Sequence, residues 1–157
     1  TKEVKDNWEK IKSLEKNNTQ DPERFFEDVP LSLPALAHAV KVQKKASQLN
    51  FDWTNASEIL SKINEEVKEL WYACETDKKI DIEEEFGDVL FSIVNLGRKL
   101  DVDPEKSLGV SIKKFKKRIS ESIKLIKAEK VSDKHLTDKK LHEIWEHAKD
   151  LLKKNDI

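Results

Sequence analysis

Long segments without glycine or proline constrain the fold of this chain more than any other feature of its sequence. The 157 residues include only 3 Gly and 4 Pro, too few turn-forming residues for a sheet of many strands. Apolar residues recur at every third or fourth position, as on one face of a helix, and no segment alternates with a period of two for long. We therefore expect an all-α fold with a four-helix-bundle-like core and additional terminal helices.

The apolar period and the few breaker residues divide the chain into six expected helices. The four central helices span about residues 34–48, 54–75, 81–99 and 103–129, and the outer helices span about 4–16 and 137–153. Helix starts are indicated by Thr54, by Asp81 followed by Glu84, by Asp103 with Pro104, and by Thr137. Residues 1–30 then form an amino-terminal helix and linker, with one turn near residues 24–28, and residues 31–157 form the main domain. Residues 130–136 are expected to form a loop, and Phe51 and Trp53 to pack against the core.

The composition excludes several classes of protein. With 30 Lys and Arg against 31 Asp and Glu, the net charge is −1, so neither general attraction to nucleic acid nor stable nucleic-acid binding is expected. No stretch approaches the roughly 18 apolar residues needed to cross a membrane. The single cysteine, Cys74, allows neither an internal disulfide nor a thiolate zinc site and suits a reducing, cytoplasmic location. Because the chain begins at Thr1 and contains no Met, we expect a trimmed amino terminus and a larger parent protein.

Carboxylates on two consecutive helices form the most informative pattern in the sequence. Glu65, Glu66 and Glu69 lie beside the apolar stripe of the helix expected over 54–75, together with Lys62. On the next helix, Glu85 and Asp88 lie one turn apart and again border the apolar stripe. If the two helices pack antiparallel, these carboxylates converge and repel one another unless a cation binds between them. A set of oxygen ligands such as Glu66, Glu69, Glu85 and Asp88 suits Mg²⁺, or Mn²⁺ in its place.

The acids could also be solvated surface charges or ligands of a di-iron site. Charged residues make up 39% of the chain, so the acids could line solvated helix faces, and this is our interpretation of Glu83 and Glu84. A di-iron bundle would need Glu-x-x-His on two helices. Here the residues at that spacing are Glu69 and Asp88, and the four histidines lie elsewhere, so we do not expect iron.

A basic segment complements the acidic one. Residues 61–88 contain ten acids and four bases, net −6, whereas residues 111–130 contain eight bases and two acids, net +6. A basic helix face could simply pair with the acids. Acids that hold a metal beside bases that hold phosphate are also the arrangement used in phosphoryl chemistry. The chain has no glycine-rich phosphate loop, which argues against a P-loop or Rossmann mechanism.

The pattern Glu65-Glu66-x-x-Glu69, fifteen residues, then Glu85-x-x-Asp88 resembles the EExxE…ExxD signature of the MazG nucleoside triphosphate pyrophosphohydrolases. These belong to the all-α NTP pyrophosphatase superfamily. The likeness runs from Val29 to about Leu151 and includes the segments LPALAHAVKVQKKA, NFDW, KINEEVKEL, EEEFGDVLFSIVNLGRKL and KKFKKR. The segment NWEKIKSLEK resembles the connection between the two domains of tandem MazG proteins. The chain therefore resembles the carboxy-terminal, catalytic-type domain of such a protein.

The resemblance implies Mg²⁺-dependent hydrolysis of nucleoside triphosphates between the α- and β-phosphates, to monophosphate and pyrophosphate, by a homodimer. It implies that the metal ligands are Glu66, Glu69, Glu85 and Asp88. It places Lys62 and Glu65 near the phosphates and the metal, and it implies nucleotide contacts by Lys114, Phe115, Lys117, Arg118 and Trp145. Trp145 could instead serve only helix packing. Two alternatives are left open: a base-selective dCTP, dUTP or phosphoribosyl-ATP pyrophosphatase of the same superfamily, and a non-catalytic helical interaction module.

Overall fold

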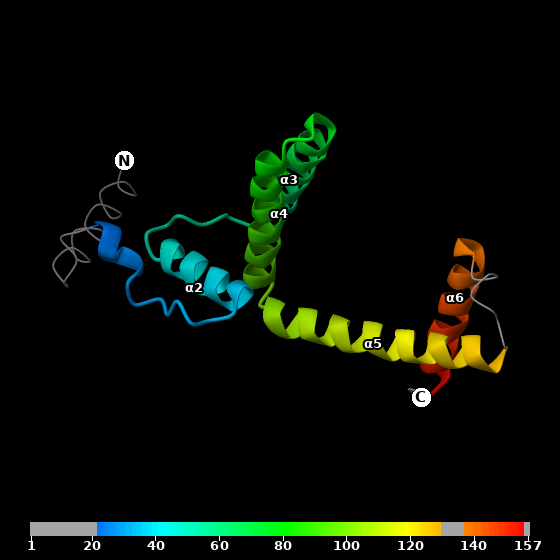
Figure 1. Cartoon of the computed structure of the whole chain (residues 1–157). Helices are drawn as coiled ribbons and strands as arrows, with labels where there is room; N and C mark the ends of the chain where they lie inside the picture. The colour runs from blue at the N-terminus through cyan, green and yellow to red at the C-terminus, as the bar shows by residue number, and fades with distance from the viewer. Residues whose placement is uncertain (1–21, 130–136, 156–157) are drawn as a thin grey trace. The chain divides into compact units, whose positions relative to one another are not determined.

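A computed structural model describes residues 22–129 and 137–155 of the chain, and every regular element in these ranges is helical (Figure 1). The elements are the short 3₁₀ helix η1 (Pro22–Phe26) and the α-helices α2 (Ala35–Ser47), α3 (Ala56–Thr76), α4 (Lys79–Lys99), α5 (Pro104–Ala128) and α6 (Asp138–Asn155). The all-α prediction is therefore confirmed. The helix expected at residues 4–16 and the loop expected at 130–136 lie outside the described residues.

The chain divides into two compact units, residues 1–105 and 106–157. The first unit contains η1, α2, α3, α4 and the first two residues of α5. The second unit contains the rest of α5 and α6. Three of the four helices expected in the core thus belong to the first unit, which also contains all the predicted metal ligands.

The α3–α4 hairpin forms the centre of the first unit, with its two helices running antiparallel side by side (Figure 1). Asp77 makes the turn between them in the left-handed conformation, with φ 52°, which a short polar side chain tolerates better than most. Helix α2 packs against α4, and the buried Gln43 side chain donates a hydrogen bond of 2.8 Å to the carbonyl of Phe91. Ile59, Ala73 and Val94 are buried in this unit.

Two predicted helix starts are corrected by one or two residues. Asn55, rather than Thr54, caps α3, because its side-chain oxygen accepts a 3.0 Å hydrogen bond from the Glu58 amide. Helix α4 begins at Lys79, two residues before Asp81, and Lys78 provides no side-chain cap. The left-handed turn at Asp77 lets the chain reverse immediately, so α4 starts without a capping box. Asp81 lies in the first turn instead, where a negative charge is favourable.

The loop before α3 is held by polar contacts rather than by its aromatic residues. Phe51 is 75% exposed and Trp53 is 39% exposed, so the prediction that these two residues pack against the core is wrong. Asp52 instead accepts hydrogen bonds from the Arg98 guanidinium near the end of α4, and Lys99 donates to the Trp53 carbonyl at 2.6 Å. These contacts fix the entry to α3 against the end of α4.

Part of the apolar surface of the hairpin is not covered within the described structure. Val67 and Cys74 on α3 are exposed, as are Phe86, Leu90, Ile93 and Leu100 on or just after α4. Their helical spacing alone predicts that these side chains face inward. Periodicity identifies an apolar face but does not determine what covers it, and here α3 and α4 bury only a narrower strip.

In the second unit, contacts near the start of α6 join it to the end of α5. Lys140 forms a 2.8 Å ion pair with Glu129, and Ile144 and Ala148 are buried. Thr137 accepts a hydrogen bond from the Lys140 amide at 3.3 Å, which confirms the predicted cap. None of the helices that the structure describes combines the length and the apolar character needed to cross a membrane.

Candidate metal centre and nucleotide site

Three of the predicted metal ligands converge between α3 and α4. Glu66 and Glu85, together with Asp88, each offer one carboxylate oxygen, and these three oxygens lie within 4.8 Å of one another. The antiparallel hairpin produces this arrangement because it places the acidic edge of α3 beside that of α4. An oxygen-only donor set with this spacing fits a hard divalent cation such as Mg²⁺ or Mn²⁺.

The three acids differ in their access to water. Glu66 is 6% exposed, Glu85 is half-buried and Asp88 is exposed. A buried carboxylate is costly unless it is paired or bound to a metal. Glu66 is paired: the Lys62 ammonium lies 2.7 Å from its Oε1 atom and also 2.7 Å from Oε1 of Glu65. Hydrogen bonds to Glu65 and Glu66 raise the pKa of Lys62, so the lysine remains charged at neutral pH.

The remaining predicted ligand, Glu69, lies next to this cluster. The pKa of Glu69 is raised above its ordinary value. The largest cause is partial loss of water around the carboxyl, and the next are its hydrogen bond with Glu66 and the repulsion by the charge of Glu66. Desolvation also raises the pKa of Glu85, and the charges of Asp88 and Glu66 add to the effect. Desolvation is the main cause of both shifts, and repulsion between the acids contributes to each. A bound divalent cation would remove this repulsion, so the residues present fit the metal that the sequence predicts.

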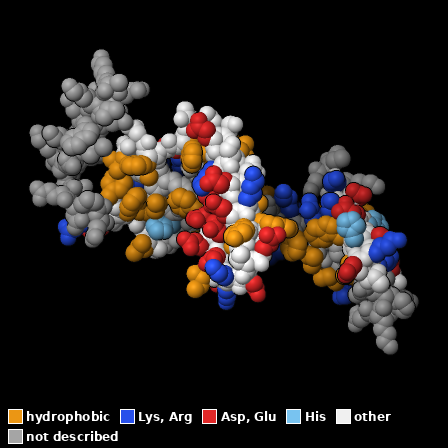
Figure 2. Space-filling view, turned by 90° about the horizontal axis from the view of Figure 1, so that it is seen from above, with side chains coloured by type: hydrophobic (Ala, Val, Ile, Leu, Met, Phe, Trp, Pro, Cys, Tyr) orange, Lys and Arg blue, Asp and Glu red, His pale blue; other side chains and the backbone are white. Residues whose placement is uncertain are grey.

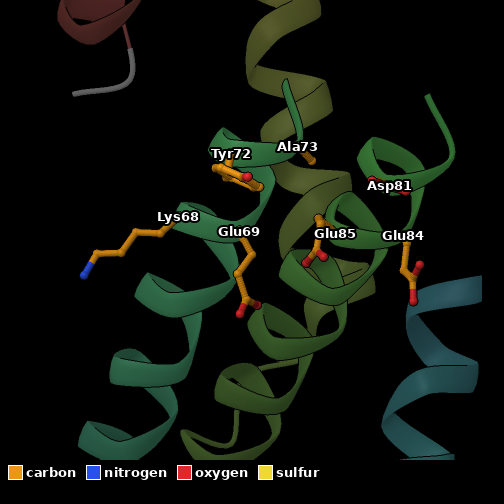
Figure 3. Close-up of a pocket in the computed structure, with 7 residues that line it drawn as sticks. All are labelled: Lys68, Glu69, Tyr72, Ala73, Asp81, Glu84 and Glu85. Carbon is orange, nitrogen blue, oxygen red and sulfur yellow. The ribbon is translucent and has the colours of Figure 1, made fainter. Parts of the chain in front are cut away.

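A pocket of about 410 Å³ opens beside the carboxylates, between the second half of α3 and the first half of α4. Glu69 and Glu85 face each other across it, whereas Glu84 points away from α3 (Figure 3). Acidic side chains form a continuous band over this part of the molecule (Figure 2). Lys68 and Tyr72 also line the pocket. Neither residue was predicted from the sequence, although Tyr72 follows Glu69 by three residues and therefore belongs to the same helix face.

The second unit brings together part of the predicted nucleotide-binding set. The rings of Phe115 on α5 and Trp145 on α6 have centroids 5.6 Å apart, and the Arg118 guanidinium lies 5.7 Å from the Trp145 ring. Lys114 and Lys117 are exposed on the same helix, α5. An aromatic pair with an arginine over one ring is suited to stacking on a base or to pairing with a phosphate.

Comparison with known proteins identifies the domain to which the carboxylates belong. Residues 54–122 match the family model described as the MazG nucleotide pyrophosphohydrolase domain. Residues 54–122 are therefore similar to a MazG domain. The match includes α3, α4 and the basic part of α5, so all the predicted metal ligands and the block Lys114–Arg118 lie within the MazG segment.

Two curated relatives extend the similarity beyond the MazG segment. A protein of Thermotoga maritima named nucleoside triphosphate pyrophosphohydrolase/pyrophosphatase MazG is 44% identical over 142 residues, which cover 90% of this chain and 54% of the relative. A protein of Escherichia coli K12 named nucleoside triphosphate pyrophosphohydrolase is 33% identical over 149 residues, covering 94% of this chain and 56% of the relative. The chain thus spans about half the length of these curated relatives.

Proposed function

We propose that this chain hydrolyses nucleoside triphosphates between the α- and β-phosphates, giving a nucleoside monophosphate and pyrophosphate in a Mg²⁺-dependent reaction. The observation that carries the proposal is the convergence of Glu66, Glu85 and Asp88 within 4.8 Å inside a MazG segment. The names of the two relatives support the same reaction class. Control of nucleotide pools, or removal of unwanted nucleotides in the cytoplasm, is the cellular role that we propose.

In this mechanism, a cation held by the carboxylates would polarise the triphosphate and lower the pKa of an attacking water. Glu66, Glu85 and Asp88 bind that cation, with Glu69 as a neighbouring ligand or base. Because Glu69 is more exposed than Glu66 and lies beside the trio rather than within it, it is the better candidate to accept the proton of the water. Lys62 balances charge on the phosphates, with Glu65 holding it in place.

The nucleotide contacts that we propose come from α5 and α6. Lys114, Lys117 and Arg118 would balance phosphate charge, and the Phe115–Trp145 pair would stack on the base. Stacking on an aromatic face tolerates every base, so these two residues favour a broad substrate range over a dCTP- or dUTP-selective one.

We further propose that the chain forms a homodimer. The support is the apolar stripe on α4, where Phe86, Leu90 and Ile93 follow one another at helical spacing and are all exposed. A stripe of this kind is typical of surfaces that bind another protein.

Product analysis tests the reaction directly. The chain is incubated with a panel of NTPs and dNTPs, with and without Mg²⁺, and pyrophosphate and orthophosphate are assayed separately. We expect metal-dependent monophosphate and pyrophosphate in equal amounts, and the relative rates give the base preference. Orthophosphate as the direct product, or turnover that does not depend on a metal, would contradict the proposal.

A further inference from the structure

Lys62 occupies the position from which a cation neutralises the buried acid of the metal centre. Its side chain is 30% exposed, and its ammonium lies 2.7 Å from Oε1 of Glu66, whose side chain is 8% exposed. Glu66 is also the least exposed member of the three-carboxylate cluster. A lysine ammonium and a divalent cation at the same carboxylate repel each other strongly. The ion pair seen here therefore competes with metal binding.

A second acid gives Lys62 an alternative partner. Glu65, with a side chain 58% exposed, also lies 2.7 Å from the Lys62 ammonium. Lys62 can therefore leave Glu66 and keep a counter-charge on the solvent side of α3. An approaching triphosphate provides a stronger anion on that side, because its oxygens carry several charges.

We propose that Lys62 is an exchangeable counter-ion that couples metal binding to nucleotide binding. Without nucleotide, Lys62 neutralises Glu66 and keeps the affinity of the centre for free cations low. Bound triphosphate draws the ammonium from Glu66 to its phosphates, and the released carboxylate binds the metal. The two ligands then bind cooperatively, and each raises the affinity of the other by the same factor. This inference rests on the proposed function, since it concerns how the same carboxylate centre is filled.

Direct titration with Mn²⁺, followed by calorimetry or by electron paramagnetic resonance of the free ion, tests the exchange without any turnover. In the absence of nucleotide, we expect Lys62→Met to bind Mn²⁺ about tenfold more tightly than the unmodified chain, because the competing charge is gone. Lys62→Arg should bind it more weakly, since a guanidinium can hold a carboxylate through two hydrogen bonds. The Arg variant retains the ion pair, so it tests the proposal even if the Met variant folds poorly.

The matched control is Lys79→Met on α4. Lys79 forms a Lys–Glu pair of the same i,i+4 spacing with Glu83, at 3.7 Å, on an exposed face. Its removal changes the net charge equally but frees no ligand of the metal cluster. We expect its Mn²⁺ affinity to lie within about twofold of the unmodified chain, because exposed charges are screened.

The second measurement is the cooperativity between Mn²⁺ binding and nucleotide binding. A non-hydrolysable α,β-methylene nucleoside triphosphate should tighten Mn²⁺ binding to the unmodified chain by a larger factor than to Lys62→Met. Equal Mn²⁺ affinities of the unmodified chain and Lys62→Met, with and without the analogue, would overturn the exchange while leaving the metal centre intact. If the unmodified chain and both Lys62 variants bind no Mn²⁺ even with the analogue, the proposed function itself fails.

Discussion

At the scale of single residues, the environments of similar acids separate the proposed metal ligands from surface charges. Among the described residues, Glu66 is the one charged side chain that is buried, and the pKa of its neighbour Glu85 is raised by desolvation and by the charges of Asp88 and Glu66. Glu83, two residues before Glu85, has a side chain that is 69% exposed and pairs with Lys79. Glu83 and Glu85 on α4 therefore have the same chemistry in different surroundings, and of these two only Glu85 lies where its negative charge is unfavourable.

Glu85→Gln and Glu83→Gln are a matched pair that tests this difference. Glu85→Gln should lower turnover by about 10² to 10³-fold, because a ligand that positions the metal is lost. It should also abolish the rise in melting temperature that Mn²⁺ produces, while leaving the metal-free protein as stable as before or more so, since a repelled charge is gone. Glu83→Gln should keep both properties. Undiminished turnover in Glu85→Gln, measured by pyrophosphate release, would contradict the assignment.

At the scale of helices, the sequence indicates which helix faces carry the acids, but it does not indicate how these faces are oriented relative to one another. Proline at position 104 and the apolar period locate α5 to within a residue. The one-turn spacing of the acids places them correctly at one edge of α3 and α4. Which acids converge depends on the rotation of the hairpin, and this rotation sets Glu69 beside the trio rather than within it. The tether from Asp52 to Arg98 joins residues that are 46 positions apart, so no local sequence signal predicts it.

The contact between α2 and α4 depends on a buried amide that is only half satisfied. Gln43 donates to the Phe91 carbonyl, but its Oε1 atom is buried without a hydrogen-bond partner among the described residues. Gln43→Ala should cost about 2 kcal/mol, mainly through the cavity it leaves. Gln43→Met should cost less than about 1 kcal/mol, because it fills the space and removes the unpaired oxygen. Urea unfolding measures the stability of both variants. A Met variant less stable than the Ala variant would show that the hydrogen bond of the Gln43 amide, rather than packing, joins the two helices.

The tether between the α3 entry loop and α4 should make stability depend on pH. Burial alone would raise the pKa of Asp52, but hydrogen bonding and charge from Arg98, with the charge of Lys99, hold it below its ordinary value of 3.8. A folded-state pKa below the unfolded one means that the stabilisation is complete above pH 3.8 and is lost as the pH falls through the lower folded value. Asp52→Asn should therefore cost about 1 to 2 kcal/mol at neutral pH.

That cost should shrink as the pH falls below 3.8 and through the lower folded-state pKa of Asp52, where the folded chain loses this charge as well. Urea unfolding of both proteins at a series of pH values measures the difference. A cost that stays constant across the series would mean that the carboxylate charge of Asp52 does not contribute to the tether.

At the scale of the whole molecule, the first unit leaves an apolar stripe uncovered on the helix that carries two of the proposed metal ligands. Phe86, Leu90 and Ile93 form this stripe. With about 100° of rotation per residue, Glu85 and Asp88 lie on other sides of α4 than the stripe. A homodimer that uses the stripe would therefore bury apolar surface while the carboxylates stay open to a nucleotide.

Leu90→Glu tests the proposed dimer. Burying an unpaired carboxylate in an apolar contact is strongly unfavourable, so we expect light scattering after gel filtration to give a dimer mass for the unmodified chain and a monomer mass for the variant. Leu90 is 41% exposed, and helicity measured by circular dichroism should therefore persist. Ser57→Glu, on an exposed position of α3 away from the stripe, adds the same charge and should remain dimeric. A monomer mass for the unmodified chain, or a dimer mass for Leu90→Glu, would contradict the proposed interface.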